Sequence, residues 1–167
     1  ERYYAFTYGN ARFFVLDSNE YSFALTDQTA WLERQLAEAA ADPSLLHRFV
    51  VMHHPPFSTS LHGGHPELRE MWTPIFERYG VDAVFTGHEH FYERLKPQKG
   101  VQYFIVGSSA KLREGNIAKT ELTAKGFDQD NVFLVAEIAG EEMRFQTITR
   151  TGKVVDSGSF RRAEKSR

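Results

Sequence analysis

The chain has 167 residues, of which 41% are hydrophobic and 25% charged, and its formal net charge is −2. These values are typical of one globular domain, and the lack of a basic stripe argues against a nucleic-acid or membrane-surface partner. The chain has no cysteine, which excludes disulfides, thiolate metal sites and cysteine nucleophiles. No apolar run approaches the ~20 residues of a membrane span, and the N-terminus does not resemble a signal peptide.

The first part of the chain predicts a β-hairpin followed by a helix. Residues 2–17 contain two β-rich runs, and Gly9-Asn10 between them is a good turn signal. Apolar residues at helical spacing predict a helix over residues 26–41, with Thr26 as its N-cap. We expect Asp17, at the end of the hairpin, to form a turn rather than bind a metal.

The main chemical feature is a pair of predicted buried strands that end at, or are closely followed by, histidines. Residues 48–53 end at His53, and residues 81–85 are followed closely by His88 and His90. In an extended chain, side chains two residues apart point to the same side, roughly 6.5–7 Å apart. Two such imidazoles could each reach a different member of a metal pair about 3.5–4 Å apart. A lone histidine at a strand end is more often a structural residue, so the predicted metal site depends on all three.

The segment between these strands supplies further candidate residues. His54 alternates with His53, so we expect it beside the metal ligands or facing the substrate. The loop over residues 57–65 is polar and expected to be mobile. Its His62 and His65 could protonate a leaving group or bind an anionic substrate, and an ordinary solvent-exposed role is equally compatible with the sequence.

The other segments predict helices and strands that contain no candidate functional residue. Residues 67–79 have apolar positions at helical spacing, and Pro74 predicts a kink or a new start within this helix. Residues 102–106 predict a strand, and residues 132–160 predict a three-stranded β-meander. Glu93-Arg94 is interpreted as a structural pair that steadies the loop after His90 rather than as catalytic. A helix joined to a strand by a tight turn is typical of an α/β fold.

Two motifs in this order resemble a known family. Val50-Val51-Met52-His53 and Gly87-His88-Glu89-His90 resemble the last two metal-binding motifs of the calcineurin-like metallophosphoesterases, and most closely those of the purple acid phosphatase branch. The flanking Trp31-Leu32 and Tyr92-Glu93-Arg94 agree with this, and the likeness covers nearly all of the chain. The resemblance implies an α/β fold, a two-layer β-sandwich flanked by helices.

The resemblance also implies an activity and a ligand set. The activity would be hydrolysis of a phosphate ester by a metal-bound hydroxide, at a pair of divalent or trivalent ions such as Fe, Zn or Mn. By position, His53 and His88 would bind one ion and His90 the other. His62 or His65 would lie where the family keeps a substrate-binding or proton-donating histidine. Such relatives are compatible with a soluble, extracytoplasmic protein, although the sequence does not fix the compartment.

The family's first three motifs, which supply the aspartate ligands and an asparagine, have no counterpart in this sequence. Three neutral imidazoles do not balance the charge of two metal ions. We therefore expect residues 1–167 to be the C-terminal portion of a single domain, inactive alone and with partial or no metal occupancy. Its partner would be the missing N-terminal half, docked at an exposed sheet edge that also favours self-association.

Two alternatives stay open at this point. The first is a non-catalytic binding or docking module on the same fold, in which the histidines have no catalytic role. The second is a mononuclear zinc site made by His53, His88 and His90, with water as the fourth ligand.

Overall fold

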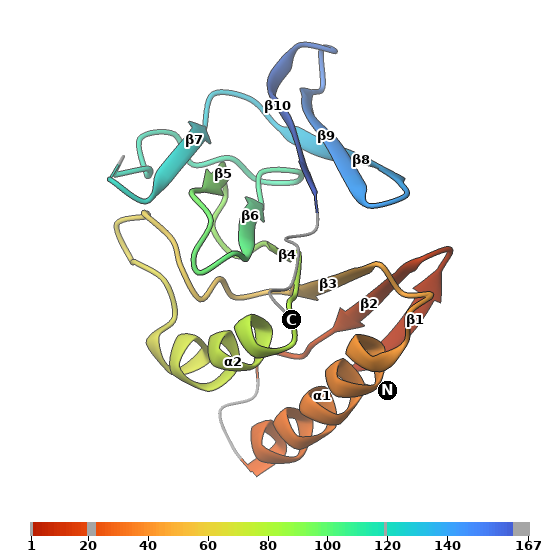
Figure 1. Cartoon of the computed structure of the whole chain (residues 1–167). Coiled ribbons are helices and arrows are strands. Elements are labelled where there is room, and N and C mark those ends of the chain that lie inside the picture. Colours follow the sequence, from red (N-terminus) through yellow and green to blue (C-terminus); the bar gives the residue numbers. More distant parts are fainter. Residues whose placement is uncertain (1, 20–22, 119, 162–167) are drawn as a thin grey trace.

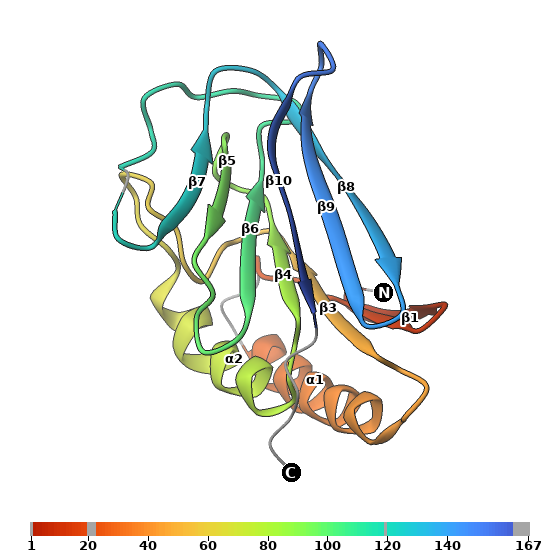
Figure 2. The same cartoon turned by 45° about the horizontal axis from the view of Figure 1, so that its top comes forward.

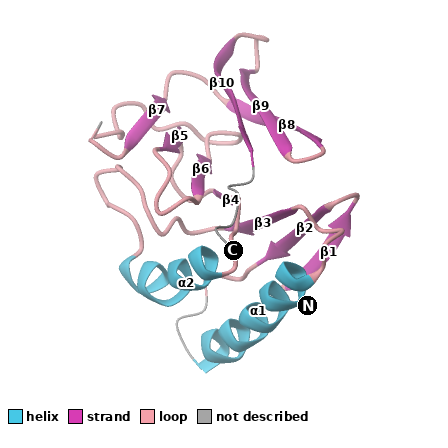
Figure 3. Ribbon diagram, in the orientation of Figure 1, coloured by secondary structure: helices cyan, strands magenta, loops and turns pink. Residues whose placement is uncertain are grey.

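The computed structural model describes residues 2–19, 23–118 and 120–161 as two β-sheets and two α-helices (Figure 1, Figure 3). The helices are α1 (Phe23–Ala41) and α2 (Pro66–Arg78). The strands are β1 (Tyr4–Tyr8), β2 (Ala11–Val15), β3 (His47–Met52), β4 (Ala83–Thr86), β5 (Tyr92–Leu95), β6 (Gln102–Val106), β7 (Thr123–Phe127), β8 (Val132–Ala139), β9 (Glu142–Thr149) and β10 (Val154–Arg161).

The strands form two sheets that lie face to face. The larger sheet has the order β1-β2-β3-β4-β6-β5-β7, and β2, β3, β4 and β6 run parallel at its centre. Strands β8, β9 and β10 form a separate antiparallel meander. Helices α1 and α2 connect successive parallel strands in the same direction, so both cover one face, and the meander covers the other (Figure 2). This arrangement confirms the predicted two-layer β-sandwich flanked by helices.

One hydrophobic core lies between the large sheet and the helices. In α2, the fully buried Leu68, Trp72 and Phe76 recur every four residues and so form one apolar stripe. The stripe packs against the helix-facing residues Val50 of β3 and Val84 of β4, which are also fully buried. The alternation of side chains along a strand sends the intervening residues to the opposite face.

A second, aromatic core lies between the two sheets. Phe49, Phe85 and Phe104 stand on neighbouring strands, with ring centroids 6.0 Å and 5.3 Å apart. Phe145 of β9 closes this row from the small sheet, 5.0 Å from Phe104. Strands β3 and β4 are therefore packed on both faces, which makes their carboxyl ends a firm platform for the loops that follow.

The structure corrects several local predictions. Thr26 does not cap α1, because the helix begins at Phe23. Pro74 lies exposed inside a continuous α2 and does not start a new helix. Glu93 and Arg94 make structural contacts, as predicted, but with different partners, because neighbouring strand residues point to opposite faces. Glu93 accepts from the Thr59 amide at 3.0 Å, and Arg94 binds Asp156 at 2.8 Å. No helix in the described ranges has the length and apolar character needed to cross a membrane.

Candidate metal centre

The register of β3 and β4 brings the two histidine motifs together. Met52 pairs with Thr86 in the parallel ladder, so the next residues, His53 and Gly87, are neighbours at the same edge. The Gly87 amide donates to the His53 carbonyl at 3.0 Å, which extends the pairing by one step. His88 then takes a positive φ of 63° and turns the chain sharply out of the sheet.

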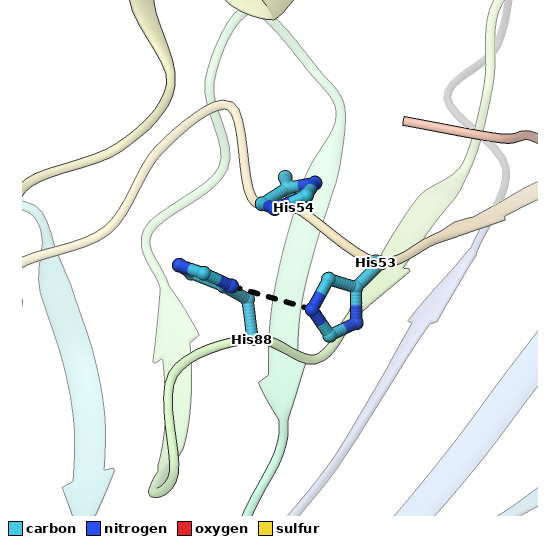
Figure 4. Close-up of side chains that lie close together, drawn as sticks. All are labelled: His53, His54 and His88. Carbon is cyan, nitrogen blue, oxygen red and sulfur yellow. Dashed lines mark hydrogen bonds between the residues drawn. The ribbon is translucent and has the colours of Figure 1, made fainter. Parts of the chain in front are cut away.

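Three imidazoles converge at this edge, as Figure 4 shows. His53 Nε2 lies 3.3 Å from His88 Nδ1. One ring nitrogen from each of His53, His54 and His88 lies within 4.8 Å of the others. Among the described residues this is the one cluster of three or more potential metal-ligating side chains, and it contains no carboxylate. His54, predicted to lie beside the ligands, thus belongs to the same cluster as the predicted ligands His53 and His88.

Ser18, immediately after β2, holds His54 in place. The His54 amide donates to Ser18 Oγ at 2.9 Å, and His54 Nδ1 lies 3.1 Å from both the carbonyl oxygen and Oγ of Ser18. Burial, together with the neighbouring His88, His53 and His65, lowers the pKa of His54 to about 4. The ring is therefore neutral at physiological pH, which is the form that a metal ion binds.

His90 lines a pocket to which His53 and His88 also contribute. A pocket of about 240 Å³ is lined by His53, His62, His88, Glu89, His90 and Arg113. His90 does not belong to the close three-histidine cluster. Burial lowers the pKa of His90, and the positive charges of Arg113 and Lys111 lower it further. The Arg113 amide donates to the His90 carbonyl at 2.9 Å, which fixes the cationic segment beside this histidine.

The two loop histidines lie at the rim. His62 lines the pocket with His53 and His88, whereas His65 lines an adjoining depression together with His62 and His88. His65 Nδ1 is 3.0 Å from Glu67 Oε2, and its ring centroid is 5.6 Å from that of His54. Both predicted candidates are thus close to the imidazole cluster, but outside it.

Two buried glutamates accept hydrogen bonds from the first half of the loop over residues 57–65, and residues 61–63 are exposed. The Glu89 carboxylate accepts from Ser60 Oγ at 2.9 Å. The Glu93 carboxylate accepts from the Thr59 amide at 3.0 Å and also from the Thr59 hydroxyl. Residues 58–60 are buried, so the first half of the loop is packed against the sheet.

Sequence reasoning missed Arg113 and the structural use of Glu89. Glu89 lies between two predicted ligands, and its burial could have been suspected from that position. Arg113 belongs to an irregular segment in which no periodicity marks it. Asp17 was predicted correctly as a turn residue: its Oδ1 accepts from the Asn19 amide at 3.0 Å.

The donor set determines which ions fit the cluster. All three donors are imidazole nitrogens, the ligands that suit Zn, Fe, Cu and Ni, and no carboxylate balances a high charge. One divalent transition-metal ion therefore fits the residues present, whereas a pair of ions needs oxygen donors from elsewhere.

Comparison with known proteins identifies the family of this chain. The sequence model of the calcineurin-like phosphoesterases matches residues 2–92, more than half of the chain. The chain belongs to the calcineurin-like phosphoesterase family. Members of this family are metal-dependent, and the histidine cluster after β3 and β4 is the candidate metal site of this member.

The relatives of this calcineurin-like phosphoesterase include acid phosphatases. Human tartrate-resistant acid phosphatase type 5 is 30% identical over 133 residues, which cover 75% of this chain and 40% of that protein. Soybean (Glycine max) purple acid phosphatase is 34% identical over 109 residues, or 62% of this chain and 23% of that protein. The structure of a purple acid phosphatase from yellow lupin seeds has the same fold, with a TM-score of 0.85 and 20% identity over 97% of this chain and 33% of that one. The chain spans less than half the length of these relatives.

Proposed function

We propose that this chain is part of a metal-dependent phosphatase that hydrolyses phosphate monoesters or diesters. The observation that carries the proposal is the convergence of imidazoles from two separate strand ends, within a calcineurin-like phosphoesterase. His53 and His88, whose ring nitrogens are 3.3 Å apart, would hold one ion. His90, in the same pocket but outside the close cluster, would hold the other.

The ions, when bound, would lower the pKa of a water molecule and offset the charge on the phosphoryl oxygens. The side chains of this chain would bind the ester and transfer protons around that centre. His62 lines the pocket beside His88 and is the candidate proton donor to the leaving oxygen. His65 at the rim, 3.0 Å from the Glu67 carboxylate, is the candidate second histidine for binding the substrate anion.

Arg113 adds a group that the sequence did not predict. It lines the pocket with four of the proposed functional histidines, and its backbone amide donates to the His90 carbonyl. A guanidinium presents several donors in one plane, a geometry that matches two oxygens of a phosphate group. Arg113 would therefore orient the phosphoryl group next to the metal ligands.

The proposal includes a second part of the domain that supplies oxygen ligands. The described histidine cluster has none, and the relatives are more than twice as long as the segment they share with this chain. Edge strand β1 offers a place for that part: Tyr4, Phe6 and Tyr8 on one of its faces are 43%, 45% and 80% exposed. Phe6 stacks on Phe13 at 4.9 Å, so this face continues the aromatic row between the sheets. Alone, the chain would be inactive, and the same edge would favour self-association.

The test is hydrolysis of a chromogenic phosphate ester by the complete natural protein that contains this chain. His88→Ala should lower kcat/KM by more than about a hundredfold, since loss even of residues that only orient metal ligands costs about 10–100-fold. Lys153→Ala, at an exposed position on the small-sheet side, is the matched control and should leave the rate unchanged. Full activity in His88→Ala would overturn the proposal.

A non-catalytic module on the same fold is the second candidate. The absence of a carboxylate from the described cluster favours it. Metal analysis separates the two functions, because the complete phosphatase should carry about two ions per chain and a binding module should carry no stoichiometric metal.

A further inference from the structure

We propose that Glu89 is a positioning residue, which acts through Ser60 to hold His62 beside the reacting ester. The inference rests on the proposed function, in which His62 donates a proton to the leaving oxygen, and it adds the group that keeps this histidine in place. It gives a role in the reaction to the residue that lies between the two predicted ligands His88 and His90.

The path from Glu89 to His62 consists of two hydrogen bonds that meet at one hydroxyl group. Ser60 Oγ donates to Glu89 Oε1 at 2.9 Å and accepts from the His62 amide at 3.2 Å. The same hydroxyl lies 3.5 Å from the Gly63 carbonyl. Because it has one proton, the nearer and charged acceptor is favoured. The carboxylate therefore orients the hydroxyl so that its lone pairs face the backbone of His62.

Glu89 is itself held firmly. It is 3% exposed, its amide donates to the Gly87 carbonyl at 2.7 Å, and its carbonyl accepts from the Phe91 amide at 2.9 Å. The chain after β6 passes so close that a Cβ added to Gly107 would overlap the Glu89 carbonyl oxygen. Glycine at this position permits the close approach of the two backbones. Ser60 is therefore bonded to a carboxylate whose own position is fixed.

The other oxygen of Glu89 contacts the segment that carries Arg113. Asn116 Nδ2 donates to Glu89 Oε2 at 3.4 Å. An antiparallel bridge between Ser60 and Ile117 joins the same segment to the histidine loop. One carboxylate thus contacts both the loop with the candidate proton donor and the segment with the candidate phosphate-binding arginine.

The placement of His62 depends on these bonds because packing contributes little to it. Residues 61–63 are exposed, whereas Ser60 and Glu89 are buried. His62 and Glu89 both line the pocket of about 240 Å³ and the adjoining one of about 320 Å³. A general acid must lie within hydrogen-bond reach of the atom that it protonates, and a misplacement of about 1 Å can lower a rate about 100-fold. Loss of the Ser60 hydroxyl should therefore affect the protonation step.

The experiment compares two substrates of the complete natural protein that contains this chain. One is an aryl ester with a good leaving group, p-nitrophenyl phosphate, and the other is a simple alkyl phosphate. Protonation matters most for the alkyl ester, because an alkoxide is the more basic leaving group. Ser60→Ala should lower kcat/KM about 10–100-fold for the alkyl ester and less than about threefold for the aryl ester. Ser159→Ala, at an exposed position on β10, is the matched control and should change neither.

A double-mutant cycle separates positioning of His62 from a general structural role. His62→Ala should show the same selective loss on the alkyl ester. Adding Ser60→Ala to it should lower the rate by less than about a further twofold, because the group that Ser60 positions is already gone. Glu89→Gln keeps an oxygen acceptor for Ser60 and should retain most of the alkyl activity, whereas Glu89→Ala should reproduce Ser60→Ala.

Metal content and thermal unfolding of each variant control for changes in the metal site and in folding. If Ser60→Ala does not fold, the comparison of Glu89→Gln with Glu89→Ala takes its place. Equal losses on the two esters, or a full additional loss in the double variant, would overturn the inference and leave the proposed phosphatase intact. Hydrolysis of neither ester by the natural protein would overturn the proposed function and the inference with it.

Discussion

The centre and the edge of the large sheet differ in how completely their side chains are buried. At the centre, β3 and β4 have helices on one face and aromatic side chains on the other, and Phe49 and Val84 are buried. At the edge, β1 has one neighbour, and Tyr4, Phe6 and Tyr8 leave much of their surface in water. The imidazoles therefore follow strands that are packed on both faces, whereas the side chains on one face of β1 are exposed. The centre of the sheet therefore positions the candidate ligands, and the exposed face of β1 is where the proposed second part of the domain would pack.

The largest expected contrast between the two regions is in stability. Phe49→Ala should lower the free energy of unfolding by about 3–5 kcal/mol, because it leaves a cavity between the sheets. Tyr8→Ala, at the exposed edge, should change it by less than about 0.5 kcal/mol. Urea denaturation of both variants measures the difference. Equal losses would mean that the edge is already packed in solution, for instance by a second copy of the chain.

A smaller effect is expected where the histidine loop is attached to the centre. Glu93→Ala removes the acceptor for the Thr59 amide and for the hydroxyls of Thr59 and Thr123. Leaving buried donors without a partner should cost about 1–3 kcal/mol and speed hydrogen exchange of the amides in residues 58–60. Glu137→Ala, at an exposed position on β8, is the control. Unchanged exchange in Glu93→Ala would show that other contacts hold the loop.

The smallest effect is a pH dependence from His54. Burial and the neighbouring imidazoles lower its pKa from 6.5 to about 4 in the folded, metal-free chain. The unfolded chain then binds more protons between these values, so stability should decrease as the pH falls through that window. In His54→Gln this part of the slope should disappear, which thermal unfolding at about pH 7 and pH 4.5 can measure. An identical slope in both proteins would contradict the assigned environment.

Local sequence patterns predicted that the ends of two strands meet. An apolar run that ends at His53, and a second run followed by His88, were enough to predict convergence, because parallel neighbours end at the same edge of a sheet. The place of His54 within the cluster depends on Ser18, which lies 36 residues away and carries no local signal. Arg113 likewise reaches the pocket from an irregular segment.

The errors also have physical causes. Glu93 and Arg94 were interpreted as one structural pair, although alternation along β5 sends them to different faces and different partners. Residues 57–65 were expected to be mobile from their polar composition. Composition does not show that Glu89 and Glu93 are buried. Their carboxylates accept hydrogen bonds from Ser60 and Thr59 in the first half of this loop.

X-ray absorption at the metal edges of the complete, metal-loaded protein tests the central claim most directly, because it counts the imidazoles around the ions. The account predicts imidazole nitrogens at about 2.0–2.1 Å from the metal, and fewer of them in His88→Ala. A first shell without imidazole nitrogens, or one unchanged in His88→Ala, would contradict it.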